Sequence, residues 1–519
     1  MKKTGDNVKF STKYGVCEYA LGKSLGGGGE GSVFEITTNA KNGLVPAAVK
    51  IIDTSKKSQK EILTIKRRIQ ELIDIRNASK EKAKTKGYVP LSSFMTLPQA
   101  MLDGDVGYVM GKVDGHEPLT NYITIPKDEQ EQIEWQKKYD LRRRYKVIAY
   151  LFERLEKIHI EGLIFSDLSP NNILVSEKND ASPRFIDTDN LRTKASPFTN
   201  VLGTPGFIAP ELYKDIDSSA ALTGEEAENA NKVHFLSEES DVYSAAVIAF
   251  ELLTLNHPFK GIKAIGEDTT PDDELAAERG EMDYILKPGT DNYCDSNIFV
   301  EKFDDITTPE IRDLFARTFI AGKENPLRRP SASEFKNEFQ RASRLIVNCP
   351  FCGEEMIYSI ESGASETFSS HTACINPECE KKIEGQLVLL IYAIGKNQSP
   401  DEVILGPKAA IHSKESVVIS TIILHEDETE KVYFPDIGIS GDLKDVDRFM
   451  EIKVSKDTAH VRVLQQPKGS TIEIASTKGA QPVQVIESAS FPYDHDYLRF
   501  HQVKTRYGTL AINGTITRI

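Results

Sequence analysis

The sequence predicts an α+β protein of several domains, with a mixed first part, a small cysteine-rich segment and an all-β end. Three observations support this prediction. Short β-branched runs separated by turn residues occur near the start and again after residue 386. Between about residues 140 and 255 the apolar residues recur at helical spacing, and two pairs of cysteines follow. The length of 519 residues also exceeds what one ordinary core can hold.

The composition is that of a globular protein, with 39% hydrophobic and 27% charged residues. A formal net charge of −14 argues against nucleic acid as a partner. The first residues are polar and show no signal-peptide pattern, and we expect residues 1–13 to be frayed. The longest apolar run, Leu387 to Ile394, is too short to cross a bilayer, so we expect no membrane partner. Six cysteines make no disulfide framework in so long a chain, which favours a cytoplasmic protein.

A glycine-rich motif lies among the first expected strands. Gly26, Gly28 and Gly31 form G-x-G-x-x-G, and Val33 follows after one residue. In dinucleotide-binding folds this motif opens a helix, but here the β-branched and aromatic run S-V-F-E-I-T follows. We therefore expect a hairpin whose side-chain-free backbone lies over phosphates. A merely flexible hairpin is the alternative.

The next strand ends in A-A-V-K, which places Lys50 at the end of an apolar run. A charged amphipathic helix is expected over residues 58–78. A lysine beside a phosphate loop can contact phosphates while a carboxylate of that helix holds it. Glu71 is the expected partner of Lys50, and Glu61 is the alternative.

The middle of the chain is expected to contain a strand over 107–113 and a helix over 140–161 that ends at Gly162. F-I-D-T-D at 185–189 is an expected strand that ends in carboxylates. A strongly apolar helix is expected over 240–255.

The stretch I-F-S-D-L-S-P-N-N-I-L at 164–174 places Asp167 and Asn172 five residues apart around a turn. In phosphoryl transfer an aspartate can accept the proton of the attacking hydroxyl, and an asparagine can hold Mg²⁺. Alone, this spacing is a weak signal because turns are rich in aspartate and asparagine.

The order of four residues and one longer motif adds specificity. Lys50, Asp167, Asn172 and Asp187 are followed by G-T-P-G-F-I-A-P-E at 203–211. With these motifs the chain resembles the eukaryotic-type (Hanks) Ser/Thr protein kinases, in a divergent bacterial branch. The resemblance spans residues 15–345 and implies a bilobal kinase fold, with an N-lobe of about 15–112 and a C-lobe of about 113–345.

The resemblance also implies a site. It implies that ATP and Mg²⁺ are bound. It also implies that Met110 is the gatekeeper and that the backbone of Gly111 and Val113 binds adenine. The implied catalytic set is Asp167, Lys50, Asn172, Asp187 and Glu71, with Asn172 and Asp187 as Mg²⁺ ligands. The implied nucleotide-binding set is Gly26, Gly28, Gly31, Val33, Ala48, Lys50, Met110, Gly111, Val113, Asn172 and Asp187.

Two further motifs resemble supporting parts of that family. S-D-V-Y-S resembles a helix whose aspartate, Asp241, braces the catalytic loop. L-R-R-P-S resembles the late arginine motif, which implies that Arg329 pairs with Glu211 of A-P-E.

The chain departs from the family at several positions. Ser166 stands in place of the arginine that precedes the catalytic aspartate, which implies a site that does not need a phosphorylated activation loop. Ser169 stands in place of a lysine near the γ-phosphate. Thr188 and Asp189 replace the phenylalanine and glycine that follow the metal-binding aspartate. We expect Asp189 to face solvent, and metal binding is the alternative.

The two cysteine pairs predict a zinc ribbon over residues 346–385. Cys349, Cys352, Cys374 and Cys379 supply the four soft ligands that zinc takes in tetrahedral geometry. His371 is an alternative ligand. A redox C-x-x-C motif is disfavoured because no βαβ pattern surrounds it.

Residues 386–519 predict a β-sandwich, since short β-branched runs alternate with turns at 417–424, 449–454 and 461–464. The segments 447–452 and 475–480 faintly resemble the recognition segments of forkhead-associated domains. That family's Ser, His and Asn are replaced here by Val446, Phe449 and Lys478, so we expect an interaction module without an assigned ligand.

Two functions follow as hypotheses. The first is an ATP- and Mg²⁺-dependent Ser/Thr kinase that acts on a protein substrate and recruits partners through its C-terminal modules. Resemblance to operon-linked bacterial kinases implies a phosphatase as one such partner. The alternative is a nucleotide-binding pseudokinase scaffold. Small-molecule phosphotransferases share the catalytic residues but lack the A-P-E segment.

Overall fold

The computed structural model describes residues 2–518 apart from a set of short segments. These are 13–14, 29–30, 37–46, 86–87, 179, 194–202, 214–235, 296, 344, 350, 358–373, 375, 377, 380–386, 397–401, 406–408, 413–415, 425, 433–449, 465–471, 476–482, 493–496 and 506–507.

The contacts divide the chain into two units, and one of the dividing points falls within helix α3 (Leu141–Ile160), between Ala149 and Tyr150. The first unit contains Met1–Lys127, Tyr150–Cys294 and Ala316–Ser333, and the second contains Asp128–Ala149, Asp295–Phe315 and Glu334–Ile519.

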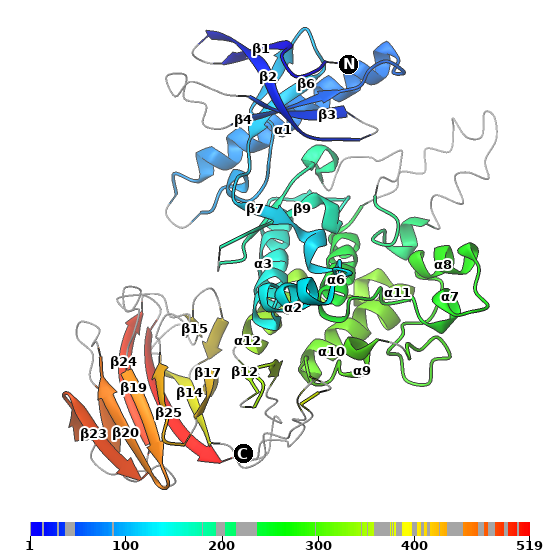
Figure 1. Ribbon diagram of the computed structural model, residues 1–519. Coiled ribbons are helices and arrows are strands. Elements are labelled where there is room, and N and C mark those ends of the chain that lie inside the picture. Colours follow the sequence, from blue (N-terminus) through cyan, green and yellow to red (C-terminus); the bar gives the residue numbers. More distant parts are fainter. Residues whose placement is uncertain are drawn as a thin grey trace. The chain divides into compact units, whose positions relative to one another are not determined.

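Six antiparallel strands near the N-terminus close into a barrel in the order β1-β2-β3-β4-β6-β5 (Figure 1). Buried aliphatic and aromatic side chains from all six strands fill the barrel. The strands are β1 (Asn7–Thr12), β2 (Gly15–Gly28), β3 (Gly31–Ile36), β4 (Ala47–Ile52), β5 (Ala100–Asp103) and β6 (Gly107–Gly111).

Strand β1 corrects one expectation. It pairs with β2 and β5, and its Val8 and Phe10 are fully buried in the barrel. The prediction that residues 1–13 are frayed is therefore wrong for this segment. The apolar residues of N-V-K-F-S-T alternate with polar ones, which is the pattern of a half-buried strand.

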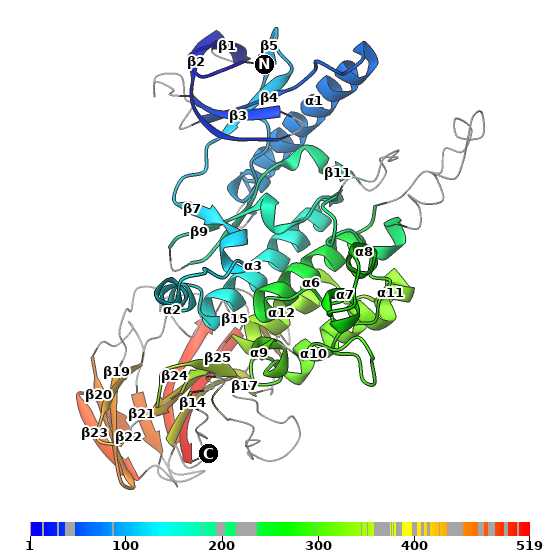
Figure 2. The same ribbon diagram turned by 45° about the vertical axis from the view of Figure 1, so that its right-hand side comes forward.

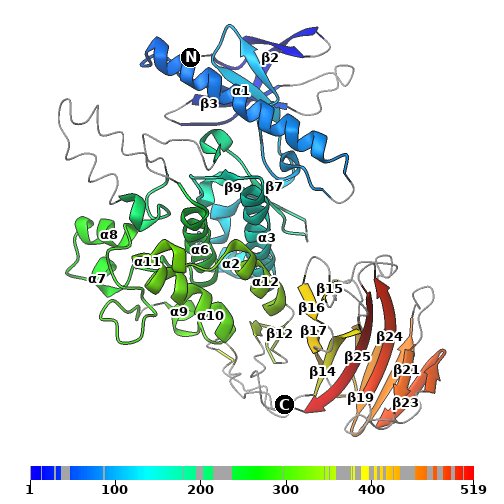
Figure 3. The ribbon, with the colours of Figure 1, turned by 180° about the vertical axis from the view of Figure 1, so that it is seen from behind.

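Helix α1 (Gln59–Lys82) lies along one side of the barrel (Figure 3). Ser58 begins the helix with a capping box, in which Ser58 and Glu61 satisfy each other's backbone amides. Ile69 on the buried face of α1 packs against Tyr108 of β6. The helix is therefore fixed both at its start and against the strand that faces it.

Helices dominate the next part of the chain, and within the described residues none is long and apolar enough to span a membrane. The apolar sequence of α6 predicts burial, and its side chains are buried along almost its whole length. The helices are α2 (Glu129–Lys138), α3, α6 (Glu238–Thr254), α7 (Ile262–Ile265), α8 (Pro271–Glu278), α9 (Ile298–Glu301), α10 (Pro309–Ala316), α11 (Gly322–Glu324) and α12 (Ala332–Ala342).

Short strands and two short helical turns carry the polar residues discussed below. One sheet has the order β10-β9-β7, and β11 pairs with β8. The elements are β7 (His116–Pro118), β8 (Leu163–Ile164), β9 (Ile173–Ser176), β10 (Pro183–Phe185), β11 (Arg192–Thr193), η4 (Pro170–Asn172) and η5 (Thr188–Asn190).

A small hairpin and an all-β segment complete the chain. The hairpin consists of β12 (Ile346–Asn348) and β13 (Glu355–Ile357). After it, one sheet has the order β17-β14-β25-β24-β21-β22, a second has the order β18-β19-β20-β23, and β15 pairs with β16. Strands form at all three runs predicted in this part.

These C-terminal strands are antiparallel wherever they pair (Figure 1). Their bounds are β14 (Leu387–Lys396), β15 (Glu402–Leu405), β16 (Ala409–His412), β17 (Ser416–Leu424), β18 (Thr429–Val432), β19 (Met450–Ser455), β20 (Thr458–Val463), β21 (Ile472–Ala475), β22 (Val483–Val485), β23 (Ser488–Pro492), β24 (Tyr497–Thr505) and β25 (Gly508–Arg518).

Candidate active site

The glycine motif forms a β-hairpin. Gly26 lies opposite Val33 and Gly28 lies opposite Gly31, while residues 29–30 at the tip are outside the described residues. A Cβ atom at Gly31 would lie 2.3 Å from a backbone oxygen of β4, so only glycine fits there. A strand follows this motif, and not the helix of a dinucleotide-binding fold, as the sequence predicts.

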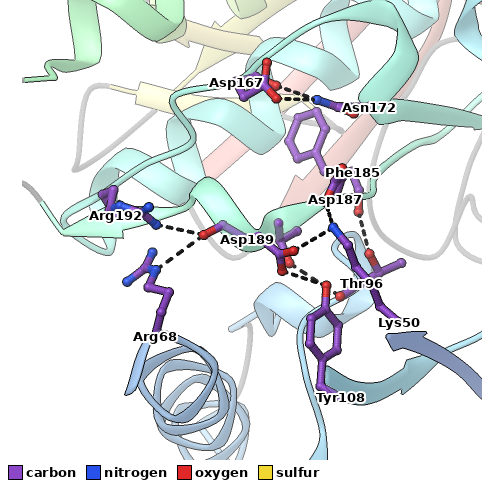
Figure 4. A network of polar contacts seen from close by, with 11 residues as sticks. Lys50, Arg68, Thr96, Tyr108, Asp167, Asn172, Phe185, Asp187, Asp189 and Arg192 are labelled. Carbon is purple, nitrogen blue, oxygen red and sulfur yellow. Dashed lines mark hydrogen bonds and ion pairs between the residues drawn. The ribbon is translucent and has the colours of Figure 1, made fainter. Parts of the chain in front are cut away.

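Lys50 extends from β4 toward two carboxylates (Figure 4). Its Nζ atom lies 2.5 Å from Oδ1 of Asp187 and 2.6 Å from Oδ2 of Asp189, and the residue is only 6% exposed. Burial alone lowers the pKa of Lys50, but the charges of Asp189 and then Asp187 outweigh it and raise that pKa above its ordinary value. The lysine is therefore a fixed positive charge.

The expected pair between Lys50 and Glu71 is not formed. The carboxylate of Glu71 instead pairs with Arg68, three residues earlier on α1, at 2.9 Å, and its side chain is 52% exposed. Glu61, the alternative partner, is used in the capping box of α1. The physical reason for the correction is that Asp189 occupies the position beside Lys50.

Asp189 does not face solvent, so the expectation for this residue is also wrong. Its side chain is 19% exposed, and Tyr108 donates its hydroxyl to Oδ1 at 2.6 Å. Its backbone oxygen accepts from Nη1 of Arg192 at 2.7 Å and from Nε of Arg68 at 3.4 Å. Both the side chain and the backbone of Asp189 are thus held (Figure 4).

Asp167 and Asn172 are brought together by the turn between them. Nδ2 of Asn172 donates to the backbone oxygen of Asp167 at 2.9 Å and to its Oδ2 at 3.1 Å. Thr204 donates its hydroxyl to Oδ1 of Asp167 at 3.1 Å. Because the amide nitrogen of Asn172 is used in these bonds, its carbonyl oxygen is the atom suited to a cation.

Asp241 of α6 braces this turn, as the sequence motif implies. Its carboxylate accepts from the amides of Phe165 and Ser166 at 2.8 and 2.9 Å, and from Nε2 of His159 at 3.0 Å. Ser166 has a left-handed backbone with φ of 68°, which is strained for a serine. Its hydroxyl also donates to the backbone oxygen of Asn190. Figure 2 shows the end of α3, which carries His159, beside α6.

Arg329 pairs with Glu211 as the sequence motif implies. The guanidinium makes two parallel bonds to the carboxylate, at 2.7 and 2.6 Å, and its side chain is fully buried. It also donates to the backbone oxygen of Glu239 and lies over the ring of Tyr243. This contact fixes the end of the G-T-P-G-F-I-A-P-E segment.

A small open pocket lies beside Asp167. Its lining includes Gly203, Thr204 and Phe207 of the same segment. Ser169, two residues after Asp167, is fully buried, and its hydroxyl has no hydrogen-bond partner among the described residues. The carboxylate of Asp167, which can accept a proton, therefore lies beside this pocket. The residue at position 169 supplies no cation there.

The comparison with known families agrees with this geometry. A family model described as "Protein kinase domain" matches residues 19–338, which is more than half of the chain. The chain belongs to the protein kinase family.

Individual relatives match the kinase over shorter stretches. Calcium-dependent protein kinase 13 of Arabidopsis thaliana is 26% identical over 198 residues, which are 37% of this chain and 32% of that protein. Serine/threonine-protein kinase PknL of Mycobacterium tuberculosis is 31% identical over 115 residues, 21% of this chain and 24% of that protein. CTD kinase subunit alpha of Schizosaccharomyces pombe is 29% identical over 197 residues, 36% and 29% of the two chains. The kinase thus spans about a third or less of these relatives.

One solved structure, titled "ROP18 kinase domain in complex with AMP-PNP and sucrose", is 14% identical. It has a TM-score of 0.43 and covers 65% of this chain and 84% of its own. The assignment of the family does not depend on it.

The residues expected to surround adenine lie at the pairing of β4 with β6. Ala48, which is buried, is opposite Met110, and Gly111 ends β6. Val113 follows two residues later, and Val33 lies on the neighbouring strand β3, opposite Lys50. Val33, Ala48, Lys50, Met110 and Gly111 therefore lie on the adjacent strands β3, β4 and β6, whereas Val113 follows β6.

The structure of the kinase brings all four expected cysteines together. Their sulfur atoms lie within 4.8 Å of one another, with 3.8 Å between Cys349 and Cys379 and 3.3 Å between Cys352 and Cys374. Four sulfurs bound tetrahedrally at about 2.3 Å from a zinc ion lie about 3.8 Å apart, so the cluster fits such an ion. His371, the alternative ligand, lies outside the described residues.

The hairpin that carries Cys349 is tied to helix α3. Nε of Arg142 lies 2.7 Å from Glu355 of β13, and the guanidinium also donates to the backbone oxygen of Ile346 at 2.6 Å. The amide of Ile357 donates to the backbone oxygen of Asp305 at 3.0 Å. The hairpin is therefore part of the same unit as the start of α3.

Sequence reasoning missed two contributors to the site of the kinase. Tyr108 and Arg68 both contact Asp189, and neither was expected there. The signal available in the sequence was the carboxylate at position 189 itself, because a carboxylate can form an ion pair with a lysine of the same site. The partners Tyr108 and Arg68 depend on tertiary packing, which no local pattern reports.

Proposed function

We propose that the kinase transfers the γ-phosphate of ATP to serine or threonine hydroxyls of a protein substrate. The proposal is supported chiefly by one observation. The pair of Lys50 and Asp187 and the pair of Asp167 and Asn172 lie in the same part of the structure (Figure 4). In phosphoryl transfer a protein contributes mainly positioning and charge stabilisation, and these residue types provide both.

The chain's own residues have distinct parts in this reaction. Lys50 binds phosphate oxygens through its fixed charge, and Asp167 accepts the proton of the attacking hydroxyl. The carbonyl oxygen of Asn172 and the carboxylate of Asp187 are oxygen ligands of the type that Mg²⁺ takes. Bound there, the ion neutralises charge on the phosphates. Thr204 keeps the carboxylate of Asp167 oriented toward the pocket beside it.

The rival function is a nucleotide-binding scaffold without transfer. The serines at 166 and 169 favour it, because each replaces a cation of the usual kinase site. The intact set of Lys50, Asp167, Asn172 and Asp187 favours transfer. We infer transfer because charge neutralisation by metal and lysine is the larger requirement.

A radiolabelled-ATP assay on the full-length protein tests the proposal. Asp187→Ala removes the carboxylate ligand and is expected to abolish phosphorylation, both of the kinase itself and of a general protein substrate. Asp268→Ala, which removes an exposed carboxylate after α7, is the matched control and is expected to retain wild-type activity. Equal labelling by wild type and Asp187→Ala would refute the enzyme and favour the scaffold.

We also propose that Cys349, Cys352, Cys374 and Cys379 hold one structural zinc ion. Support comes from the fit of their sulfur positions to tetrahedral coordination and from the composition of the segment, which offers little apolar core. Elemental analysis of protein purified without chelator is expected to find about one zinc per chain. Protein without metal, whose four thiols all react freely, would refute the site.

We propose the following domains: kinase 15–345, with lobes at 15–112 and 113–345; zinc ribbon 346–385; and β-sandwich 386–519. Supporting the sandwich, Leu389 and Ile516 of one sheet and Met450 and Ile452 of the other are buried.

We propose partner recruitment as the role of the sandwich, with a phosphatase encoded nearby as one candidate partner. The resemblance to forkhead-associated domains adds little, because Val446, Phe449, Lys478 and the segment 476–480 lie outside the described residues. We propose the cytoplasm of a bacterium as the location, on the basis of cysteine usage and of the divergent motifs. Pull-down with the full chain and with residues 1–385 would show whether partners need the C-terminal sheets.

A further inference from the structure

Lys50 has two anionic partners, and only one of them is committed to metal in the proposed reaction. Oδ1 of Asp187 and Oδ2 of Asp189 both lie within 2.6 Å of its Nζ. If Asp187 holds a metal ion, its ion pair with Lys50 is weakened. A lysine side chain is long and flexible, so it needs a second fixed anchor to stay aligned with phosphates.

Glu71 is badly placed to be that anchor. Its carboxylate pairs with Arg68, and half of its side chain is exposed to solvent. Exposed ion pairs hold a geometry weakly, because water screens them. Asp189 is the more buried carboxylate, with 19% of its side chain exposed.

Asp189 is itself held from three directions (Figure 4). The hydroxyl of Tyr108 donates to its Oδ1, which leaves Oδ2 for Lys50. The guanidinium groups of Arg68 and Arg192 donate to its backbone oxygen. Tyr108 packs against Ile69 of α1, so the anchor is connected to that helix through a side chain as well.

We infer that Asp189 is the residue that positions Lys50 for phosphate binding and connects it to helix α1, in place of Glu71. This inference rests on the proposed phosphoryl transfer. Asp189 acts through Lys50 and touches neither ATP nor the reacting atoms, so it is a positioning residue. Asp189 lies in the short turn η5, two residues after Asp187, which caps that turn, so one short segment carries both the proposed metal ligand and the lysine anchor.

The first test compares three single variants of the full-length kinase. Asp189→Asn keeps the size of the side chain but removes its charge, and is expected to lower kcat/KM for ATP about 10- to 100-fold, as for other groups that orient a catalytic residue. Glu71→Gln is expected to cause a loss at least tenfold smaller. Asp74→Asn, an exposed carboxylate elsewhere on α1, is the matched control and is expected to leave activity unchanged. A greater loss in Glu71→Gln than in Asp189→Asn would overturn the inference.

A second test asks whether Asp189 acts through Lys50. In a Lys50→Met background, where ATP affinity is measured by calorimetry, Asp189→Asn is expected to have no further effect. In the wild-type background the same change is expected to weaken ATP binding. Equal effects in both backgrounds would overturn the inference, as would a raised Mg²⁺ requirement without coupling to Lys50, which would mark Asp189 as a metal ligand.

The affinity measurements also separate this inference from the proposed function. If the wild type binds ATP but transfers no phosphate, the enzyme fails while the coupling of Asp189 to Lys50 can still be read. If transfer is present but the two residues do not couple, the positioning role fails and the kinase stands. Thermal unfolding of each variant is the control that separates a loss of ATP binding or activity from misfolding.

Discussion

A single carboxylate, Asp241, holds the turn that carries Asp167, the proposed catalytic base. It accepts two backbone amides and one histidine nitrogen while being almost completely buried. One of those amides belongs to Ser166, whose positive φ is tolerated only while the surroundings enforce it. The precision of the site thus depends on a residue that touches no substrate.

Asp241→Asn is expected to destabilise the kinase by about 1–3 kcal/mol, because an amide nitrogen cannot accept the bond that a carboxylate oxygen accepts, and one buried N–H is left unpaired. Urea unfolding measures the change. Activity should fall more than the population of folded protein does. The exposed variant Asp272→Asn serves as the control, and unchanged stability in Asp241→Asn would contradict the brace.

His257 makes a second buried contact, with the G-T-P-G-F-I-A-P-E segment at 203–211. Its Nε2 lies 2.9 Å from the backbone oxygen of Gly206, which can only accept, and its Nδ1 accepts from the amide of Phe259 at 3.4 Å. The neutral ring therefore satisfies both neighbours. Burial lowers the pKa of His257 to about 4, against an ordinary value of 6.5.

Because the folded state binds this proton less readily than the unfolded state, stability is expected to fall as pH falls from about 6.5 to about 4. Between pH 7 and pH 5 the loss from this residue is about 2 kcal/mol. His257→Gln should flatten that part of the pH dependence, whereas His460→Gln, an exposed histidine, should not. Parallel pH profiles of wild type and His257→Gln would contradict the assignment.

Residue identities could be predicted better than their pairings. Lys50, Asp167, Asn172 and Asp187 were predicted as one site, and in the structure Lys50 pairs with Asp187 and Asn172 donates to Asp167. Glu71 was assigned to Lys50 from helix position alone. Its actual partner is Arg68, because Asp189, from a different segment, occupies the position beside Lys50. Competition between distant residues is not visible in local sequence.

At the scale of elements, periodicity predicted the helices well. The apolar stripe of α3 and the continuous apolar run of α6 led to bounds within two residues of those observed. Strand β1 was missed because four polar residues outweighed two apolar ones in N-V-K-F-S-T. The hairpin β12–β13 was expected only as part of a metal site. Its attachment to Arg142 could not be read from sequence, because the two lie far apart along the chain.

Removal of zinc is expected to unfold the cysteine cluster without unfolding the barrel or the helical part. Ligation and folding of such a segment are one equilibrium, worth about 10–16 kcal/mol near neutral pH. Hydrogen exchange should show lost protection around Cys349 and Cys379, while ATP binding is retained because every residue proposed to bind the nucleotide precedes Arg192. Cys352→Ser should behave like the stripped protein. Cys294→Ser, outside the cluster, should not.

At the scale of the whole molecule, the proposed end of the kinase domain at residue 345 does not separate two independently packed parts. Arg142 and the backbone oxygen of Asp305 make polar contacts with the hairpin that follows residue 345. The hairpin belongs to one unit with the start of α3 and with residues 295–315. The chain therefore uses a cysteine-rich appendage as part of the packing of its helical portion.

A chain of residues 1–385 is expected to unfold at the same temperature as the kinase part of the full protein, whereas residues 1–345 should unfold several degrees lower. Loss of the hairpin removes charged and backbone hydrogen bonds worth about 1–3 kcal/mol, and each kcal/mol shifts Tm by about 2–4 °C in a domain of about 150–250 residues and by less in a larger one. Calorimetry checks both chains. Arg142→Ala in the full protein should lower Tm in the same direction. Identical Tm values for the two truncated chains would refute this role.

The same contact has a consequence for synthesis on the ribosome. Arg142 and Glu355 are separated by 213 positions, so Arg142 emerges long before its partner exists. At about 5–20 residues per second, the interval is roughly 10 to 40 s. During that time Arg142, in the first turn of α3, has neither its ion pair with Glu355 nor its hydrogen bond to Ile346. The first turn of α3 therefore completes these contacts only after Glu355 has been translated, and a factor that binds nascent chains has this interval in which to act.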